Sequence, residues 1–458
     1  MRRPKAAFVG FGEVNTPRDI VERKCAEARE ALERLGIDLV CAQPVSDVPD
    51  GSQAAQAVEM LSREQFDFLV LCVAGWIPSH AVVQVANEFA HKPMLLWGLA
   101  GWTEGGRLIT TADQAGTTAL RKPMAALGYR FKYVYNCPGR ALPVAKISAF
   151  AQAAMAESLL KRARIGMMGF RDMNLYGTLY DGISLRSKIG PEVETFEMLE
   201  VMQRIECLEP RAVQEVVERV KADWVFERPT EDETLRKGAK FYLALRQKVE
   251  ERGYEAVSLI DVDGMRKLAK FPPSMVFMLL ANEMGVCTIP ENDVPGAVTQ
   301  LVTKYLTGQI GAYLEFYEFM EDRVLMGVPD YVPAEVTDGP VTVKPAAFGE
   351  FSAGILNVSK LKTGRVTLCR LANTGDRYSL HMATGDAVEP RKWEEAGWSP
   401  PAPQLPGLEI VLDSPVEKFA QDVMGQHYII SYGDNTETFK DLCALLGVEV
   451  IWEGAAAA

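Results

Sequence analysis

Short apolar runs alternate with amphipathic helical patterns along the first 160 residues. Between the runs AAFVGFG and DLVCA, apolar residues recur at the 4-3-4-3 spacing of a helix, namely Val21, Cys25, Ala28, Leu32 and Leu35. Thr16, Pro17 and Asp19 are expected at the N-cap, N1 and N3 positions of that helix, and Gly36 marks its end. Strands that alternate with helices are typical of a parallel sheet covered on both faces. We therefore predict a doubly wound α/β domain over residues 1–162.

The same alternation begins again at residue 163 and changes after residue 328. The run ARIGMMG precedes helical patterns at 210–222 and 232–252 and a strand pattern at 256–260. Later segments, such as GRVTLCRLA and LEIVL, alternate with a period of two, which indicates half-buried strands. The expected architecture is α/β, with two doubly wound parallel-sheet domains (1–162 and 163–328) followed by a C-terminal β-rich, barrel-like domain (329–458). The last boundary falls between residues 306 and 340.

The composition is that of a globular protein and excludes several classes of function. Of the 458 residues, 48% are hydrophobic and 24% are charged, and the longest apolar run, residues 68–77, is about half of what a membrane-spanning helix needs. Eight cysteines without a CxxC pair favour reduced thiols, and the absence of a signal-peptide pattern adds to the expectation of a cytoplasmic protein. The net charge of -12 disfavours nucleic acid and anionic membranes and suits a neutral substrate.

Two short motifs favour local structure over ligand binding. The GxG of FVGFGEVN follows a strand, but Asn15 replaces the third glycine and Glu13 would repel phosphate, so a tight turn is the better interpretation. The DVDG of residues 261–264 lacks further acidic ligands at calcium-loop spacing. It predicts a turn that ends a strand, with Gly264 at positive φ.

The stretch TIPENDVPGA, residues 288–297, places two carboxylates at a strand-to-helix corner. Pro290 and Pro295 restrict the backbone there, and the carboxyl ends of strands in α/β sheets form ligand crevices. A simpler interpretation makes Asp293 the N-cap of the following helix and leaves Glu291 in solvent. The residues of the corner alone leave both interpretations open.

A second carboxylate favours the ligand interpretation. In GAYLEFYEF, Glu315 lies between two apolar residues of a strand, where a charge is costly unless it is paired or bound to a metal, and Glu318 is its rival on the other face. His427 begins an apolar strand, whereas the other three histidines are interpreted as structural. Two carboxylates and one imidazole suit Mn²⁺ or Mg²⁺ better than structural zinc.

Residues 291–319, ENDVPGAVTQLVTKYLTGQIGAYLEFYEF, resemble the L-fucose isomerases and their L-arabinose isomerase relatives. In that family an E-N-D corner, a helix ending at T-G and a carboxylate-bearing strand follow in this order. GQHYIISYGDNTETFKDLCALLGVEV is similar to the end of those enzymes, and AGWIPSH with LLWGLAGWTEGG is a third match. The matches keep the family's order and cover nearly the whole chain.

This resemblance implies a site and its partners. Glu291, Glu315 and His427 match the family's ligands to a divalent metal, typically Mn²⁺, with Mg²⁺ or Co²⁺ as alternatives. Trp76 matches a tryptophan that contacts the sugar, and Gln426 is expected beside the substrate. Glu315 stands where the fucose isomerases have Asp, as in the arabinose enzymes. The family assembles into trimers or hexamers, so a homo-oligomer is expected.

The function that the resemblance implies is aldose-ketose isomerisation of a free sugar such as L-fucose, D-arabinose or L-arabinose. The reaction passes through a metal-stabilised cis-enediol, and Glu291 and Glu315 act as acid and base. Two other functions stay open: another metal-dependent sugar-transforming enzyme of the epimerase or aldolase type, and a non-catalytic sugar-binding protein. Neither nucleic acid nor a membrane is an expected partner.

Overall fold

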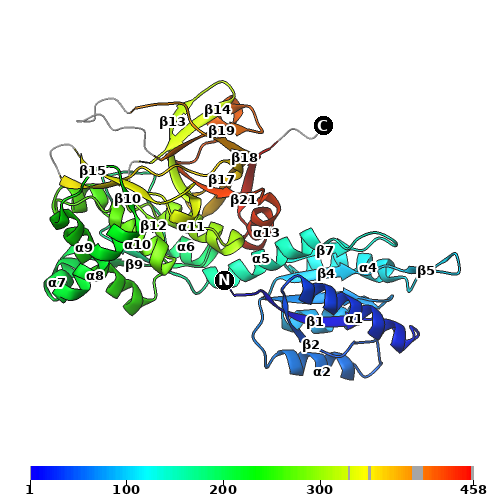
Figure 1. The fold of residues 1–458 in the computed structure, drawn as a ribbon. Helices are drawn as coiled ribbons and strands as arrows, with labels where there is room; N and C mark the ends of the chain where they lie inside the picture. The colour runs from blue at the N-terminus through cyan, green and yellow to red at the C-terminus, as the bar shows by residue number, and fades with distance from the viewer. Residues whose placement is uncertain (1, 329–330, 349–351, 395–405, 455–458) are drawn as a thin grey trace. The chain divides into compact units, whose positions relative to one another are not determined.

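The computed structural model describes residues 2–328, 331–348, 352–394 and 406–454 (Figure 1). Its contacts divide the chain into two compact units. The first unit runs from the N-terminus to Leu159 and includes the segment Glu437–Leu446, and the second comprises Leu160–Thr436 and the chain from Gly447 onward. Over the described ranges, none of the helices is both long and apolar enough to cross a membrane. The division into three domains that was expected from the sequence, with boundaries after residues 162 and 328, stays a prediction.

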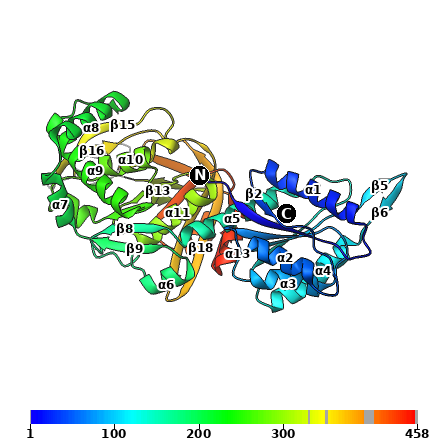
Figure 2. The same cartoon turned by 90° about the horizontal axis from the view of Figure 1, so that it is seen from below.

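The first unit is built on a parallel sheet of order β2-β1-β3-β4-β7. Its strands are β1 (Lys5–Phe11), β2 (Asp38–Cys41), β3 (Phe68–Val73), β4 (Met94–Gly98) and β7 (Phe131–Tyr135), and β5 (Trp102–Glu104) forms a separate hairpin with β6 (Arg107–Ile109). Its helices are α1 (Arg18–Arg34), α2 (Ser52–Leu61), α3 (Ser79–Glu88), α4 (Asp113–Ala126), α5 (Val144–Leu160) and α13 (Thr436–Leu446). Figure 2 shows α1 on one face of the sheet and α2, α3 and α4 on the other, which confirms the doubly wound pattern.

The long apolar run that contains β3 is explained by burial on both faces of this sheet. Leu69 and Leu71 pack in one cluster with residues of α2, α3 and α4. On the other face, Phe68 meets Phe150 of α5 edge to face, with ring centroids 5.6 Å apart. A central parallel strand covered on both sides reads as a continuous apolar run, as this one does.

The glycines of the GxG motif allow α1 to pack closely against β1. A Cβ atom at Gly10 would clash with Sγ of Cys25, and one at Gly12 would lie 2.7 Å from a methyl group of Val21. Neither glycine has a positive φ, and the turn follows them at residues 13–16. The two glycines therefore serve helix-to-strand packing, while the predicted tight turn lies one residue further on.

The start of α1 differs by one residue from the predicted start. The helix begins at Arg18, its N-cap is Pro17, and no side chain caps it, so the predicted capping role of Thr16 is wrong. Thr16 belongs to the preceding turn, where its N–H donates to the carbonyl of Glu13 at 3.0 Å. The end of the helix agrees with the sequence, because Gly36 follows it with a φ of 75°.

The second unit contains a parallel sheet of order β12-β11-β8-β9. Its strands are β8 (Arg164–Met168), β9 (Glu192–Phe196), β11 (Ala256–Leu259) and β12 (Cys287–Ile289). Its helices are α6 (Gly182–Lys188), α7 (Met198–Glu206), α8 (Pro210–Asp223), α9 (Asp232–Arg252), α10 (Ser274–Met284) and α11 (Val294–Thr307). Helix α11 contacts β11 and β12 on one side and two strands of the C-terminal sheet, β17 and β20, on the other, so most of its residues are buried.

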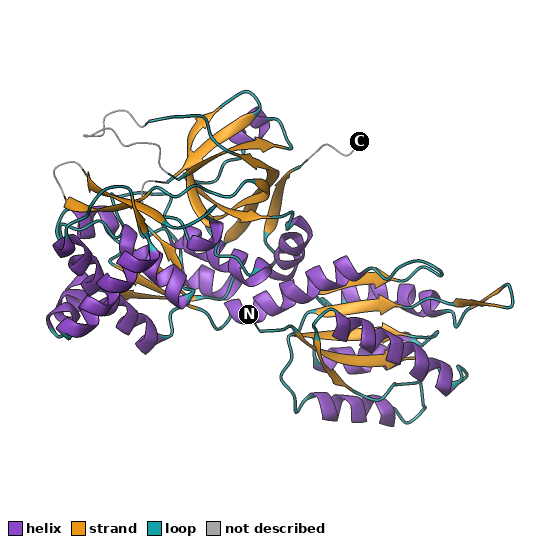
Figure 3. Cartoon of the chain, in the orientation of Figure 1, coloured by secondary structure: helices purple, strands orange, loops and turns teal. Residues whose placement is uncertain are grey.

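The C-terminal strands close into the expected barrel (Figures 1 and 3). They are β13 (Ala312–Phe319), β14 (Arg323–Gly327), β17 (Gly364–Thr374), β18 (Arg377–Val388), β19 (Gly407–Leu412), β20 (His427–Tyr432) and β21 (Glu449–Glu453). The order β17-β20-β13-β14-β19-β18 closes on itself because β17 and β18 also pair, and β21 adds to β18. A smaller sheet consists of β10 (Val225–Phe226), β15 (Thr342–Phe348) and β16 (Ser352–Asn357). Short helices occur at Asp261–Arg266, at Ala334–Val336 and, between β19 and β20, at α12 (Val416–Gln421).

A buried histidine links two strands of the barrel. His381 of β18 is fully buried, and its Nδ1 lies 2.6 Å from the hydroxyl of Tyr428 on β20. Burial lowers the pKa of His381 to about 4, so its imidazole is neutral at neutral pH. This contact fits the structural role that the sequence suggested.

We expect His381 to make the stability of the protein depend on pH. Its pKa in the folded chain, about 4, lies below the ordinary 6.5, so protons bind preferentially to the unfolded chain. Stability that is present above pH 6.5 is therefore lost as the pH falls toward 4, by about 2 kcal/mol between pH 7 and pH 5. Urea unfolding at both pH values should show a smaller loss for His381→Gln than for the unsubstituted chain. Equal losses would contradict this assignment.

Candidate active site

The corner after β12 holds Glu291 in an unusual backbone conformation. Glu291 and Asn292 have φ angles of 64° and 53°, in the left-handed region that residues other than glycine adopt at a cost. The buried amide of Asn292 donates to the carbonyl of Met168 at 2.9 Å, and the N–H of Glu291 donates to the carboxylate of Asp261 at 2.7 Å. These bonds tie the corner to the ends of β8 and β11. Glu291 is therefore fixed at the carboxyl edge of the second sheet.

The DVDG motif supports this corner. Residues 261–266 form a short π-helix, and Gly264 does not have a positive φ, so the predicted turn is wrong. Glycine is required there because a Cβ atom would lie 2.5 Å from the side chain of Ile260. The carboxylate of Asp261 faces Arg266 at 3.1 Å besides accepting the N–H of Glu291. The motif is thus part of the scaffold of the corner.

Glu315 and His427 lie directly opposite each other on the antiparallel strands β13 and β20. The carboxylate of Glu315 accepts hydrogen bonds from the amide of Gln426 at 2.6 Å and from the hydroxyl of Tyr317 at 3.0 Å. Glu318, its rival on this strand, is exposed. Gln426 therefore contacts a residue of the site, while its contact with a substrate stays a prediction.

The structure brings Glu291, Glu315 and His427 together. Oε2 of Glu291 lies 3.9 Å from Nδ1 of His427, and Oε2 of Glu315 lies 3.6 Å from Nε2 of the same ring. The side chains of Glu291 and Glu315 are 13% and 18% exposed, so the interpretation that left Glu291 in solvent is wrong. Burial lowers the pKa of His427 to about 3, which keeps its imidazole neutral at neutral pH.

The kinds of donor fit a divalent metal, although their arrangement does not yet chelate one. Two carboxylates and a neutral imidazole are donors that Mn²⁺, Mg²⁺ and Co²⁺ accept. In the part of the chain that the structure describes, no group of three or more His, Cys, Asp or Glu side chains is placed to hold a metal ion. The two carboxylates lie near different nitrogens of one ring, and a metal ion binds only one of these nitrogens. Binding by all three would require one glutamate side chain to turn.

Asp293 has a larger role than the helix cap that the sequence suggested. It does cap α11, accepting the N–H of Gly296 at 3.0 Å, which confirms that interpretation. Its carboxylate also accepts two bonds from the guanidinium of Arg370, at 2.5 and 2.8 Å, and one from the hydroxyl of Tyr313 at 2.7 Å. Burial acts to raise the pKa of Asp293, but Arg370 and the other donors outweigh burial and hold that pKa below its ordinary value. Asp293 is therefore an anion inside the protein.

Tyr313 connects Asp293 to His427. Its ring stacks on the imidazole with centroids 4.2 Å apart and planes inclined by 14°. Tyr313 lies two positions before Glu315 on β13, so both side chains project from the same face of the strand. Neither Tyr313 nor Arg370 was expected from the sequence to be part of the site.

Trp76 lies in the first unit, just after β3. Its backbone N–H donates to the carbonyl of Thr111 at 2.7 Å, and its backbone carbonyl accepts the backbone N–H of Glu13 at 2.8 Å. The residue is 39% exposed. The backbone of Trp76 is thus well fixed, and the expected contact of its ring with a sugar stays a prediction.

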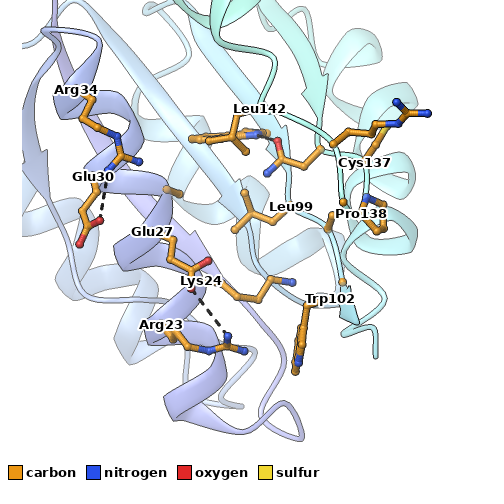
Figure 4. Close-up of a pocket in the computed structure, with 17 residues that line it drawn as sticks. Arg23, Lys24, Glu27, Glu30, Arg34, Leu99, Trp102, Cys137, Pro138 and Leu142 are labelled. Carbon is orange, nitrogen blue, oxygen red and sulfur yellow. Dashed lines mark hydrogen bonds and ion pairs between the residues drawn. The ribbon is translucent and has the colours of Figure 1, made fainter. Parts of the chain in front are cut away.

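A cavity of about 390 Å³ in the first unit is a separate feature (Figure 4). It lies between α1 and the loops that follow β4 and β7, and contains none of the expected site residues. Two of its cations have partners in the protein: the Arg23 guanidinium lies over the ring of Trp102 at 4.7 Å, and the Lys24 ammonium donates to Thr111 at 2.8 Å and pairs with Asp113. Because its lining contains none of the site residues, the cavity is distinct from the site in the second unit.

Comparison with known proteins relates the chain to sugar isomerases. It is 22% identical over 382 residues to the sulfoquinovose isomerase of Alkalicoccus urumqiensis, covering 81% of this chain and 82% of that protein. The sulfoquinovose isomerases of Priestia aryabhattai and Priestia megaterium are each 22% identical over 377 residues, covering 79% of this chain and 80% of those proteins. No family model matches the chain. The similarity supports an isomerase that acts on sugars, and the narrower resemblance to L-fucose isomerases stays a prediction.

Comparison with solved structures adds no further argument. A periplasmic solute-binding protein of Actinobacillus succinogenes with bound D-allose is 13% identical to the chain, covering 72% of this chain and 96% of that one, at a TM-score of 0.17. The arabinose-binding component from Shewanella sp. ANA-3 has the same TM-score at 10% identity, covering 67% of this chain and 86% of that one. Scores this low do not establish a shared fold. The comparisons therefore favour sugar isomerases on the similarity of sequence over most of the chain.

The strained corner predicts a specific cost for losing Asn292. Asn292→Ala removes the bond to Met168 and leaves a residue that tolerates the left-handed region less well, so we expect a loss of about 2–3 kcal/mol in unfolding free energy. Asn174→Ala is the matched control, because Asn174 has a φ of 55° but is exposed. Urea unfolding should show the larger loss at Asn292, and equal losses would contradict the role of its side chain.

Proposed function

We propose that the protein is a metal-dependent isomerase that interconverts an aldose and its ketose. The observation that carries the proposal is the approach of Glu291 and Glu315 to opposite edges of the His427 ring, at 3.9 and 3.6 Å. Similarity to three sulfoquinovose isomerases over about four fifths of the chain supports the same class of reaction. A cytoplasmic location and assembly into a homo-oligomer stay part of the proposal.

The two glutamates are the proposed acid and base. Isomerisation moves a proton between C1 and C2 of an open-chain sugar through a cis-enediol. Two carboxylates held near one centre can remove that proton and return it, since each is only partly exposed and the backbone of each is hydrogen bonded, Glu291 to Asp261 and the strand of Glu315 to β20. His427 stays neutral and does not take part in proton transfer in this scheme.

The proposed cofactor is Mn²⁺, with Mg²⁺ or Co²⁺ as alternatives, held by Glu291, Glu315 and His427. A bound divalent ion would supply positive charge beside the enediol oxygens, where negative charge develops. The protein's contribution is to keep the imidazole neutral and the two carboxylates near it. Gln426 and Tyr317 donate to Glu315 and so limit the directions in which this carboxylate can turn.

The proposed substrate is a free or sulfonated sugar. The name of the three relatives makes sulfoquinovose the first compound to test. L-Fucose, D-arabinose and L-arabinose are the neutral alternatives, and the net charge of -12 gives them an advantage in approaching the protein that a sulfonated sugar lacks. Trp76 and Gln426 are the proposed sugar contacts.

The reaction can be tested with the Mn²⁺-loaded protein and a panel of sulfoquinovose, L-fucose, D-arabinose and L-arabinose. We expect NMR in deuterated water to show a ketose formed from at least one sugar, with deuterium appearing at C2 of the aldose, because proton transfer exchanges that hydrogen. A C2 epimer or smaller fragments would instead indicate the epimerase or aldolase alternative. Binding without any conversion would indicate a sugar-binding protein.

The roles of the two glutamates predict a large loss of turnover in their amides. Glu291→Gln and Glu315→Gln should each lower kcat by about a thousandfold or more, since each removes a proton carrier and a charged ligand. Glu318→Gln is the matched control on the same strand, and because Glu318 is exposed it should leave kcat unchanged. Circular dichroism and urea unfolding should show that the variants remain folded. Normal turnover of either active-site variant would refute its assignment.

A further inference from the structure

Asp293 joins the structural elements that carry the three proposed metal ligands. It lies two residues after Glu291 in the same corner, and its carboxylate accepts the hydroxyl of Tyr313, which precedes Glu315 by two residues on β13. Tyr313 in turn stacks on His427 of β20. One buried carboxylate is thus two contacts away from His427 and lies in, or contacts, the segments that carry Glu291 and Glu315.

The charge on Asp293 is costly to bury and is offset by a buried cation and by hydrogen bonds. Arg370 and Asp293 are 3% and 2% exposed, and the guanidinium binds the carboxylate through two hydrogen bonds. A buried ion pair is weak evidence for a more stable fold, because well-packed apolar residues in its place often give equal or greater stability. Its value lies in geometry, since a bidentate contact fixes both partners in direction as well as in distance.

The contact between Tyr313 and His427 transmits that geometry to the site. The two rings are nearly parallel, at 14°, so a displacement of Tyr313 would tilt or release the imidazole. The hydroxyl of Tyr313 is held by Asp293 at 2.7 Å, which prevents the ring from moving independently. With the ring in this position, Nδ1 of His427 lies 3.9 Å from the carboxylate of Glu291 and Nε2 lies 3.6 Å from that of Glu315.

We infer that Asp293, Arg370 and Tyr313 form a positioning device that orients the His427 ring between Glu291 and Glu315 and thereby sets the affinity of the site for its metal. This inference rests on the proposed function. The three residues act through His427 and do not themselves bind the metal or the sugar. Removal of one contact in the device should weaken metal binding more than it weakens the fold.

The test is Tyr313→Phe in the full chain, with Tyr242→Phe as the matched control. Phenylalanine keeps the ring but removes the bond to Asp293. Tyr242 is equally buried, and its hydroxyl also donates to a carboxylate, that of Glu283, at 2.7 Å. Binding of Mn²⁺ is measured by electron paramagnetic resonance of the free ion, without substrate, and stability is measured by urea unfolding.

We expect Tyr313→Phe to raise the dissociation constant for Mn²⁺ about tenfold, and Tyr242→Phe to leave it unchanged at a comparable loss of stability. Asp293→Asn keeps a side chain of the same shape but leaves Arg370 without its anion, and should weaken Mn²⁺ binding at least as much. An affinity of Tyr313→Phe within twofold of the unsubstituted chain would overturn the inference. So would an equal loss of affinity in Tyr242→Phe, because that result would mean a general effect of stability.

The outcome separates this inference from the proposed function. If the unsubstituted chain binds Mn²⁺ and Glu315→Gln abolishes that binding, the assignment of the metal ligands is supported, and the result for Tyr313→Phe then bears only on the positioning role. If the unsubstituted chain converts no sugar and binds no Mn²⁺, Mg²⁺ or Co²⁺, the proposed function fails first, and the positioning role fails with it.

Discussion

The antiparallel register that sets Glu315 opposite His427 is the constraint on which the candidate site depends. A slip of one residue would turn one of the two side chains to the other face of the sheet and separate them. Closure of the barrel prevents such a slip, because β20 is hydrogen bonded to β13 on one side and to β17 on the other. The carboxylate and the imidazole therefore meet through sheet pairing, although they are far apart in the sequence.

Glu291, the third residue of the site, is positioned by a strained corner and not by sheet pairing. Glu291 sits on a corner with two successive residues in the left-handed region, an arrangement that persists only where the surroundings enforce it. Bonds from Asn292 to Met168 and from Glu291 to Asp261 provide that support. The same short segment supplies Asp293, which meets Arg370 from β17. Strain and a buried ion pair thus occur together, at the place where the two halves of the site must be aligned.

The sequence was sufficient for the parts of this arrangement that have a local signal. Periodicity predicted both α/β sheets and several strands of the barrel, and the cost of a charge in an apolar strand singled out Glu315. The same argument applied to Arg370 in TLCRLA would have found a second buried charge, and the two-residue spacing on β13 would have placed Tyr313 on the face of Glu315.

Other features lay beyond the reach of the sequence because they depend on contacts between distant segments. The stacking of Tyr313 on His427 follows from the pairing of β13 with β20 and has no local signature. Gly264 was expected at a positive φ, but the requirement for glycine there comes from the side chain of Ile260. The opposite directions of the two carboxylates around one ring are likewise set by side-chain torsions that a sequence pattern does not encode.

The path of the last segment has a consequence for dividing this protein into parts. After β20 the chain contributes α13 to the first unit, where Lys132 of β7 meets Glu437 and Asp441 at 2.6 Å, and it then returns to pair β21 with β18. The first unit is consequently discontinuous in sequence. A fragment cut at its obvious end, Leu159, would lack a helix and leave a cationic side chain without its anions, so neither portion of this molecule can be excised as a self-sufficient module by a single cut.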